Sequence, residues 1–182
     1  WEGGSGDGLA DSLESGLNLI NRYPVPQAMA WADHTADRLR NLQRDTGIIA
    51  GWHGDGNTAR TMIMYALWKS RGAYVRPWRA DVRVGAAVNE DGATQFLVAA
   101  DWPYEGTLHF DLPRHAEYWN LPADYPRLNQ FPQWFTAHAK HNYAVREGEG
   151  EPRVVDGTVL LAGVTVAVTK DGPFLLTVAP AK

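Results

Sequence analysis

The sequence predicts an α+β protein in which three helices are followed by an antiparallel β-sandwich. Two observations carry this prediction. Apolar residues recur at helical spacing as far as Gly72, and beyond Gly72 they occur in short β-branched runs separated by turn residues. The change of period predicts two domains, one over residues 1–72 and the other over residues 73–182.

The helical part contains three segments. The first ends before Pro24, and its apolar stripe consists of Leu9, Leu13, Leu17 and Ile20. The second begins at Pro26, because proline is favoured in the first helical turn. The third begins after Asp55 or Asn57, which are good capping residues, and runs to Gly72. Its middle, residues 62–68, is apolar on all sides, which is typical of a helix that is buried all round.

The second half of the chain contains seven predicted strands. They cover residues 82–88, 94–99, 107–112, 143–146, 158–161, 164–169 and 174–178. Turn residues 89–92 predict a hairpin between the first two, and residues 170–172 predict a tight turn between the last two. The proline-rich residues 121–135 predict an ordered loop over the sheet. This spacing favours a sandwich or a large antiparallel sheet.

Composition excludes several classes of function. Hydrophobic residues make up 45% and charged residues 21% of the chain, the net charge is −4, and there is no basic stripe, so nucleic acid is not an expected partner. The longest apolar run is too short to span a membrane. The absence of cysteine excludes disulfides and thiolate metal sites in this chain.

Two glycine-rich segments precede the first and third helices. The first segment is WEGGSGDG, residues 1–8, and the second is GWHGDGN, residues 51–57. Short connections predict antiparallel neighbours, so the first and third helices should run in parallel and begin at the same end. Glycines allow the backbone to approach a ligand, and helix N-termini attract anions. We therefore expect a functional site at this end of the helices.

The residue types at this end suit the chemistry of an acidic sugar. Arg60 could bind a carboxylate and Trp52 could stack on a sugar ring, while acids and a histidine could act as acid and base. We expect the catalytic residues to be Asp7, Asp11, His53 and Asp55. We expect the substrate-binding residues to be Glu14, Trp52, Asn57 and Arg60.

A purely structural interpretation of the same residues is also open. Asp55 and Asn57 could simply cap the third helix, and the glycines could serve only the turn. One face of the first helix, made of Asp7, Asp11, Glu14 and Asn18, could be a solvated surface. His138 and His141 could bind a metal, but a surface turn is the favoured interpretation, and no metal site is predicted.

Two stretches of the helical part resemble a known architecture. GDGLADSLE (residues 6–14) and GWHGDGNTAR (residues 51–60) resemble segments late in the helical toroid of bacterial polysaccharide-degrading proteins, which include six-hairpin glycosidases and toroid-plus-sandwich polysaccharide lyases. The resemblance implies an active site on the rim formed by loops that enter the inner helices, with β-domains following the toroid. Three helices would supply only the final hairpin and a half, so further active-site residues would lie on a preceding part or on another chain.

From these observations we expect the C-terminal portion of a secreted or periplasmic enzyme that degrades an acidic polysaccharide. Glycoside hydrolysis would use Asp7, Asp11 or Asp55 as acid and base. Uronate β-elimination would neutralise the carboxylate at Arg60, and His53 or a tyrosine such as Tyr65 would take the proton. No cofactor is expected. The expected partners are a polysaccharide or oligosaccharide substrate and the preceding part of the protein or another chain.

Two other functions remain open. The β-domain could be a non-catalytic carbohydrate-binding module, with a stacking platform made of Trp78, Trp102, Tyr104, Trp119 and Trp134. The rings could instead be core and loop packing. Finally, the β-domain could be a structural element that braces the toroid, with residues 122–135 against the helices.

Overall fold

The computed structural model describes residues 6–49, 56–112, 118–121 and 135–181. Contacts divide the chain into two compact units, one that ends at Trp68 and one that begins at Lys69. We call the described residues up to Trp68 the helical unit and those from Lys69 onward the β unit. Both classes of element occur in the predicted order, so the α+β fold is confirmed. The assignment of residues 1–72 and 73–182 as separate domains stays a prediction.

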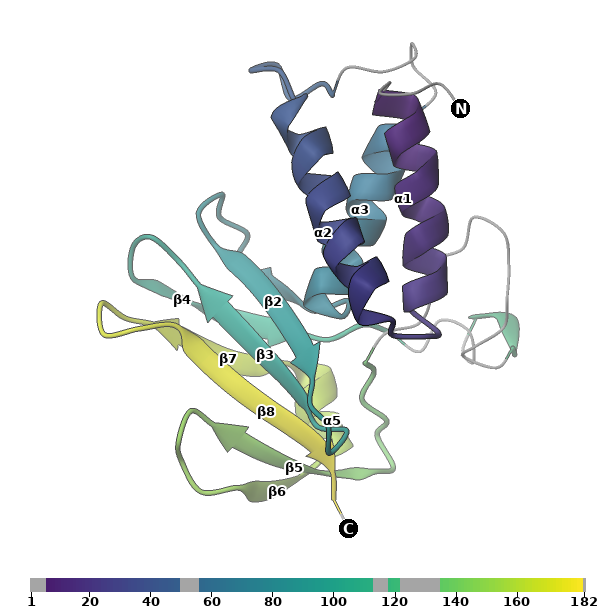
Figure 1. Cartoon of the computed structure of the whole chain (residues 1–182). Helices are drawn as coiled ribbons and strands as arrows, with labels where there is room; N and C mark the ends of the chain where they lie inside the picture. The colour runs from purple at the N-terminus through teal and green to yellow at the C-terminus, as the bar shows by residue number, and fades with distance from the viewer. Residues whose placement is uncertain (1–5, 50–55, 113–117, 122–134, 182) are drawn as a thin grey trace. The chain divides into compact units, whose positions relative to one another are not determined.

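Three helices form the helical unit, and Figure 1 shows them side by side. They are α1 (Gly6–Ile20), α2 (Pro26–Asn41) and α3 (Asn57–Ser70), whose last two residues belong to the β unit. The predicted stripe of α1 is largely correct, because Leu13 and Leu17 are fully buried. The second helix begins at the proline that the sequence singled out, and Ala32, Ala36 and Leu39 face the interior.

The third helix is not buried all round, contrary to the prediction. Met64 and Trp68 are buried, but the side chain of Ile63 is 54% exposed and Ala66 is exposed. Polar contacts replace part of the expected apolar packing. The hydroxyl of Thr61 is fully buried and donates a hydrogen bond to the carbonyl oxygen of Ala10 on α1, at 3.2 Å. One face of α3 therefore packs on α1, while Ile63 lies on a face open to solvent.

The β unit contains two antiparallel sheets. The smaller sheet has the strand order β1-β4-β7, with bounds Tyr74–Arg76, Tyr104–His109 and Val164–Val168. The larger sheet has the order β2-β3-β8-β5-β6, with bounds Arg83–Val88, Thr94–Ala99, Phe174–Pro180, Asn142–Glu147 and Arg153–Asp156. Side chains of both sheets form one apolar core, so the sheets make a sandwich-like arrangement (Figure 1).

The core of the sandwich comes from alternating side chains. Phe96 on β3 lies opposite Leu176 on β8, and Val145 on β5 lies opposite Val178 on β8. Each of these four residues is at most 1% exposed. Phe96 also meets the rings of Phe110 and Phe135 edge to face, with centroids 4.9 and 5.6 Å apart. This aromatic group joins β3 to the residue that follows β4 in the smaller sheet and to the segment that precedes β5 in the larger sheet.

One strand prediction was wrong, and two short strands were not predicted. Residues 158–161 form part of a short helix, α5 (Gly157–Ala162), because the Asp156 carboxylate accepts a hydrogen bond from the amide of Thr158 and caps it. The predicted tight turn at residues 170–172 is present, and it connects two strands, β7 and β8, that belong to different sheets. The sequence analysis also missed β1 and β6, which are short strands of three and four residues.

Candidate functional site

The N-terminal ends of α1 and α3 lie together, as the sequence predicted. The side-chain amide of Asn57, the first residue of α3, donates a hydrogen bond to the carboxylate of Asp7, with an Nδ2–Oδ1 distance of 3.2 Å. The next contacts along the same helices join Ala10 to Thr61 and Glu14 to Arg60. Both of these contacts lie further along α1 than Asp7 and further along α3 than Asn57, which shows that α1 and α3 run in parallel.

Glu14 and Arg60 form an ion pair between these helices. The Nη2 group of Arg60 donates to Oε2 of Glu14, and it also donates to Oδ1 of Asn57 at 3.0 Å. The side chain of Glu14 is only 10% exposed and that of Arg60 is 35% exposed. Glu14 is therefore not part of a solvated helix face, because burial of a carboxylate requires a partner such as this guanidinium.

The ion pair changes what Arg60 can do at this site. Its positive charge is already matched by Glu14, so a substrate carboxylate would have to share the guanidinium with that side chain. About a third of the Arg60 side chain remains accessible for such an interaction. The pair also fixes the register of α1 against α3, and hence the position of Asp7 relative to Asn57.

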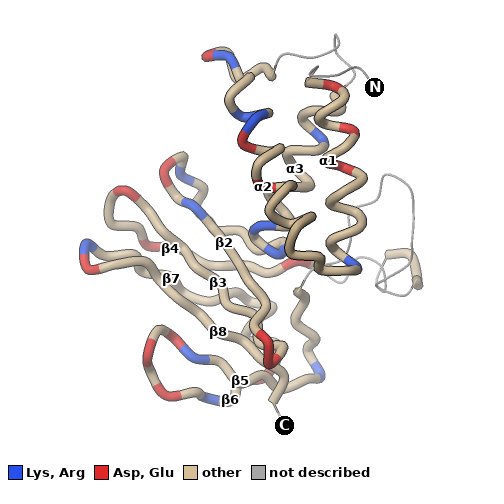
Figure 2. Tube along the Cα trace, in the orientation of Figure 1, with Lys and Arg blue, Asp and Glu red and all other residues tan. Residues whose placement is uncertain are grey.

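The other predicted acids differ in their surroundings. Asp11 is exposed, one turn after the half-buried Asp7 on the same helix. Figure 2 shows acidic residues at successive turns of α1, which correspond to Asp7, Asp11 and Glu14. Three of the predicted site residues, Trp52, His53 and Asp55, lie outside the described residues. Their roles, and the convergence of the four predicted catalytic residues, stay predictions.

Tyr65 is poorly suited to act as the base of an elimination reaction. Its hydroxyl donates a hydrogen bond to Oδ1 of Asp33 on α2, at 2.7 Å. Burial raises the pKa of the Tyr65 hydroxyl above its ordinary value, and the bond to the Asp33 carboxylate raises this pKa further. The hydroxyl therefore holds its proton more tightly than a free tyrosine does, and its observed partner is α2.

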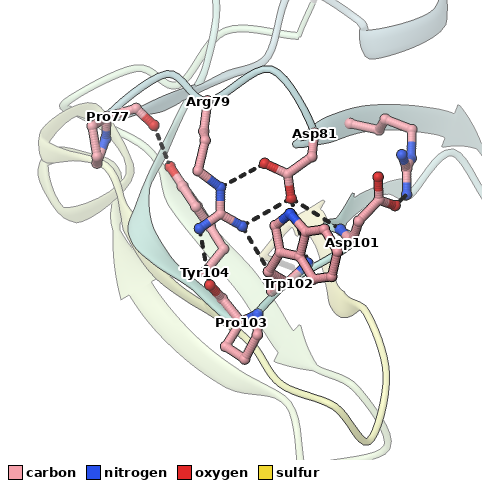
Figure 3. Close-up of polar contacts among 8 residues, drawn as sticks. Pro77, Arg79, Asp81, Asp101, Trp102, Pro103 and Tyr104 are labelled. Carbon is pink, nitrogen blue, oxygen red and sulfur yellow. Dashed lines mark hydrogen bonds and ion pairs between the residues drawn. The ribbon is translucent and has the colours of Figure 1, made fainter.

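A second cluster of polar contacts lies at a corner of the β unit, around Arg79 and Asp81 (Figure 3). The guanidinium of Arg79 binds the Asp81 carboxylate with two nitrogens, at Nε–Oδ1 2.6 Å and Nη2–Oδ2 2.9 Å. The hydrogen bonds from Arg79 lower the pKa of the Asp81 carboxyl to about 2. Asp81 thus remains ionised throughout the neutral range.

The same two side chains anchor the segment between β3 and β4. Arg79 donates to the carbonyl oxygens of Trp102 and Pro103, at 2.9 and 3.0 Å. Asp81 accepts from the amides of Asp101 and Trp102, at 3.0 and 3.4 Å (Figure 3). The corner is tightly connected, because one ion pair satisfies four backbone groups of residues 101–103.

Three residues of the predicted aromatic platform, Trp78, Trp102 and Tyr104, lie at this corner. The side chain of Trp78 is 80% exposed and that of Trp102 is 68% exposed. Tyr104, in contrast, is only 3% exposed and donates its hydroxyl to the carbonyl oxygen of Pro77 (Figure 3). Tyr104 therefore cannot stack on a ligand, because its ring points into the β unit. Trp119 is 44% exposed, and Trp134 lies outside the described residues.

Sequence reasoning missed the two ion pairs that organise these regions. Residues 46 apart form the Glu14–Arg60 pair, and only the packing of two helices brings them together. Arg79 and Asp81 are two residues apart and stand beside Trp78, so the sequence alone indicated a local ion pair. Their backbone partners at and beside Trp102 are 20 or more residues away. Such partners depend on strand pairing, which spacing along the chain does not encode.

Comparison of this chain with protein-family models, with curated proteins and with solved structures found no match. Within the described ranges, no helix is both long and apolar enough to cross a membrane. The same residues include no group of three or more histidine, aspartate or glutamate side chains placed to hold a metal ion.

Proposed function

We propose that this chain is the C-terminal portion of an enzyme that degrades an acidic polysaccharide, by glycoside hydrolysis or by uronate β-elimination. The supporting observation is the parallel pairing of α1 and α3, in which Asp7 contacts Asn57. This pairing brings the ends of both glycine-rich segments to one side of the helical unit. A polymeric substrate would place the protein outside the cytoplasm.

In this proposal the residues have different roles. Asp7 and Asp11, together with Asp55 and His53, supply the acid and base. Trp52 stacks on a sugar ring, and Asn57 donates or accepts hydrogen bonds at the same end of α3. Glu14 and Arg60 act mainly by holding α1 and α3 in register, and the accessible part of Arg60 is available to a substrate carboxylate.

Further helices would complete the toroid and the site. The side chain of Ile63 on α3 is 54% exposed, and Leu19 on α1 is 50% exposed. Helix surfaces of this kind are suited to packing against other helices. The proposed source of those helices is the preceding part of the same polypeptide or a second chain.

The test uses the full-length gene product on polygalacturonate, alginate and chondroitin sulfate, with amylose as a neutral comparison. Release of reducing ends measures any cleavage, and ultraviolet absorbance of an unsaturated uronide identifies elimination. Asp7→Asn should lower the rate by about 10²–10⁴-fold if Asp7 is the acid or base. Asp37→Asn is the matched control, because Asp37 is an exposed acid of α2 that pairs only with its helical neighbour Arg40 in the described contacts.

Full activity in all four of the variants Asp7→Asn, Asp11→Asn, His53→Ala and Asp55→Asn would show that the site is wrong. Absence of cleavage of every acidic polysaccharide by the full-length protein would count against the enzymatic function itself.

The exposed tryptophans favour a second candidate function, in which the β unit binds glycan without cleaving it. Among the described residues, Trp78 and Trp102 are the most exposed of the large apolar side chains that could stack on a sugar, and the Arg79–Asp81 pair holds the backbone of Trp102. A fixed backbone reduces the entropy lost when a ring is ordered by a ligand.

Affinity electrophoresis of the intact chain in gels that contain soluble polysaccharides tests this second function. Trp78→Ala and Trp102→Ala should each weaken retardation, whereas Tyr118→Ala should not, although Tyr118 is also 64% exposed. Equal retardation of all three variants, or no retardation of the natural chain in any gel, would remove support for it.

A further inference from the structure

A concave pocket of about 620 Å³ lies in the β unit, where β5 begins and β8 ends, beside β6. Its volume falls within the range of small-molecule sites. The described lining comes from the segment between Phe135 and Tyr143, from Val154 on β6 and from residues 180–181. This pocket shares no residue with the contacts between α1 and α3 or with the Arg79–Asp81 corner.

The turn that carries the polar side chains of the pocket is held by three hydrogen bonds. The amide of His141 donates to the carbonyl oxygen of His138 at 3.0 Å, and the amide of His138 donates to the hydroxyl of Tyr143 at 3.0 Å. The His141 carbonyl accepts from the amide of Gly157 at 2.8 Å. Gly157 has no room for a side chain, because a Cβ there would overlap the His138 carbonyl. The turn is therefore preformed.

The side chains on this turn favour an anion. Lys140 supplies a positive charge, and the rings of His138 and His141 lie 5.2 Å apart and can both present N–H donors. The described lining contains no aspartate or glutamate. The nearest carboxylate along the strands is that of Asp156, which pairs with Asn142 between β5 and β6. That carboxylate already accepts from the amide and the hydroxyl of Thr158, at 2.8 and 2.5 Å.

The rest of the lining is apolar and aromatic. Tyr143 is 4% exposed and Phe135 is half-buried, and their rings meet edge to face with centroids 6.1 Å apart. Pro180 and Ala181 come from the end of the chain beside β5. A sugar that bears a carboxylate combines the two properties that this lining complements, namely an anionic group and an apolar ring face.

We propose that this pocket binds a hexuronate unit, with the carboxylate at Lys140, His138 and His141 and the sugar ring against the apolar lining. The inference rests on the proposed function, because it assigns the acidic glycan a second contact on the β unit. A transition metal held by the two histidines is the main rival. The charge of Lys140 opposes a cation there, and two imidazoles leave a tetrahedral metal short of protein ligands.

Titration of the intact chain tests this inference, with amide resonances of residues 138–143 as the readout. The ligands are trigalacturonate, neutral galactotriose, inorganic sulfate and Zn²⁺. Trigalacturonate should shift these resonances and bind about tenfold or more tightly than galactotriose. Lys140→Gln and the double variant His138→Gln/His141→Gln should each weaken binding by about tenfold, while Lys170→Gln, at an exposed lysine of the turn after β7, should not.

Several results would overturn the inference. These are equal affinity for trigalacturonate and galactotriose, sulfate binding as strong as that of trigalacturonate, or no shift at residues 138–143. Tight Zn²⁺ binding that depends on both histidines, without any response to trigalacturonate, would assign the pocket to a metal instead. The measurement involves no cleavage, so failure of the proposed enzymatic function would appear separately, in the rates of the Asp7 variants.

Discussion

The helical unit and the β unit use polar side chains in opposite ways. In the helical unit, α1 and α3 meet through polar groups that are partly or fully buried, including Glu14, Thr61 and the Asp7–Asn57 contact. In the β unit, the interface between the sheets is apolar, and the ion pairs lie outside it, as at Arg79–Asp81 and Arg83–Asp101. The β unit is the larger of the two, and the units differ in what holds their elements together.

This difference indicates where specific function is concentrated. Buried polar groups stabilise a fold less than apolar groups of the same volume do, but they fix one register of packing. The α1–α3 contact therefore suits a site whose side chains must be placed accurately. The sandwich suits a scaffold, whose ligand contacts are confined to its surface.

Phe96→Ala should cause the largest loss, about 3–5 kcal/mol in the free energy of unfolding of the β unit. Phe96 is fully buried and contacts two other phenylalanines. Every isoleucine of the chain lies at or before Ile63, and every phenylalanine lies at or after Phe96. Isoleucine methyl signals and the assigned fluorine signals of Phe96, Phe110, Phe135 and Phe174 therefore report on the two units separately during denaturation. Leu97→Ala, at a 39% exposed neighbour, should have a much smaller effect.

Glu14→Ala should destabilise the helical unit by about 1–3 kcal/mol, because it leaves Arg60 without its buried anionic partner. In the double variant Glu14→Leu/Arg60→Met, much of this loss should be recovered. A double-mutant cycle followed by the isoleucine methyl signals measures the coupling. Simple additivity of the two single changes would contradict the view that this pair links α1 to α3.

Gly16→Ala tests the apolar side of the same unit, where α1 meets α2. A Cβ at Gly16 would overlap the ring of Trp31, so alanine should cost about 1 kcal/mol in spite of its higher helix propensity. In a Trp31→Ala background the sign should reverse, and alanine should stabilise by about 0.5–1 kcal/mol. Thermal unfolding of the four combinations measures both values, and the same sign in both backgrounds would refute the steric explanation.

The two units should respond to opposite extremes of pH, with the smallest effects of the series. The pKa of Asp81 is about 2 in the folded chain and 3.8 ordinarily. The contribution of its ionised carboxylate to the free energy of unfolding is therefore complete above pH 3.8 and is lost as the pH falls toward 2. The pKa of Tyr65 is raised above its ordinary value of 10.0. The contribution of its protonated hydroxyl to the free energy of unfolding is therefore complete below pH 10 and is lost as the pH rises further. Phenylalanine fluorine signals and isoleucine methyl signals during thermal unfolding measure the two effects. Asp81→Asn and Tyr65→Phe should each abolish the corresponding dependence.

Regular patterns made much of the fold predictable from the sequence. The leucine stripe of α1, Pro26 at the start of α2 and the hairpin of β2 and β3 all follow local rules, and the structure has all three. Residues 158–161 resemble a strand in the sequence, because they are apolar or β-branched, but Asp156 caps a helix there. The turn at 170–172 gave no sign that its two strands enter different sheets.

The candidate site was predictable only in part. Helix polarity brought the starts of α1 and α3 together, as expected from short connections, and the Asp7–Asn57 contact followed from it. The pairing of Glu14 with Arg60 could not be foreseen, because each side chain alone looked like a surface or ligand-binding group. The burial of Tyr104 and the exposure of Trp78 likewise depend on which face of the sandwich each ring takes.

The parallel arrangement of α1 and α3 can be measured directly, because the chain has no cysteine of its own. Spin labels would be attached at two pairs of exposed positions, Asp11→Cys/Ala59→Cys and Leu19→Cys/Ala59→Cys. Positions 11 and 19 are separated by about 12 Å along the helix axis. The account predicts the shorter label-to-label distance for Asp11→Cys/Ala59→Cys. A shorter distance for Leu19→Cys/Ala59→Cys would place the helix starts at opposite ends and contradict the shared site.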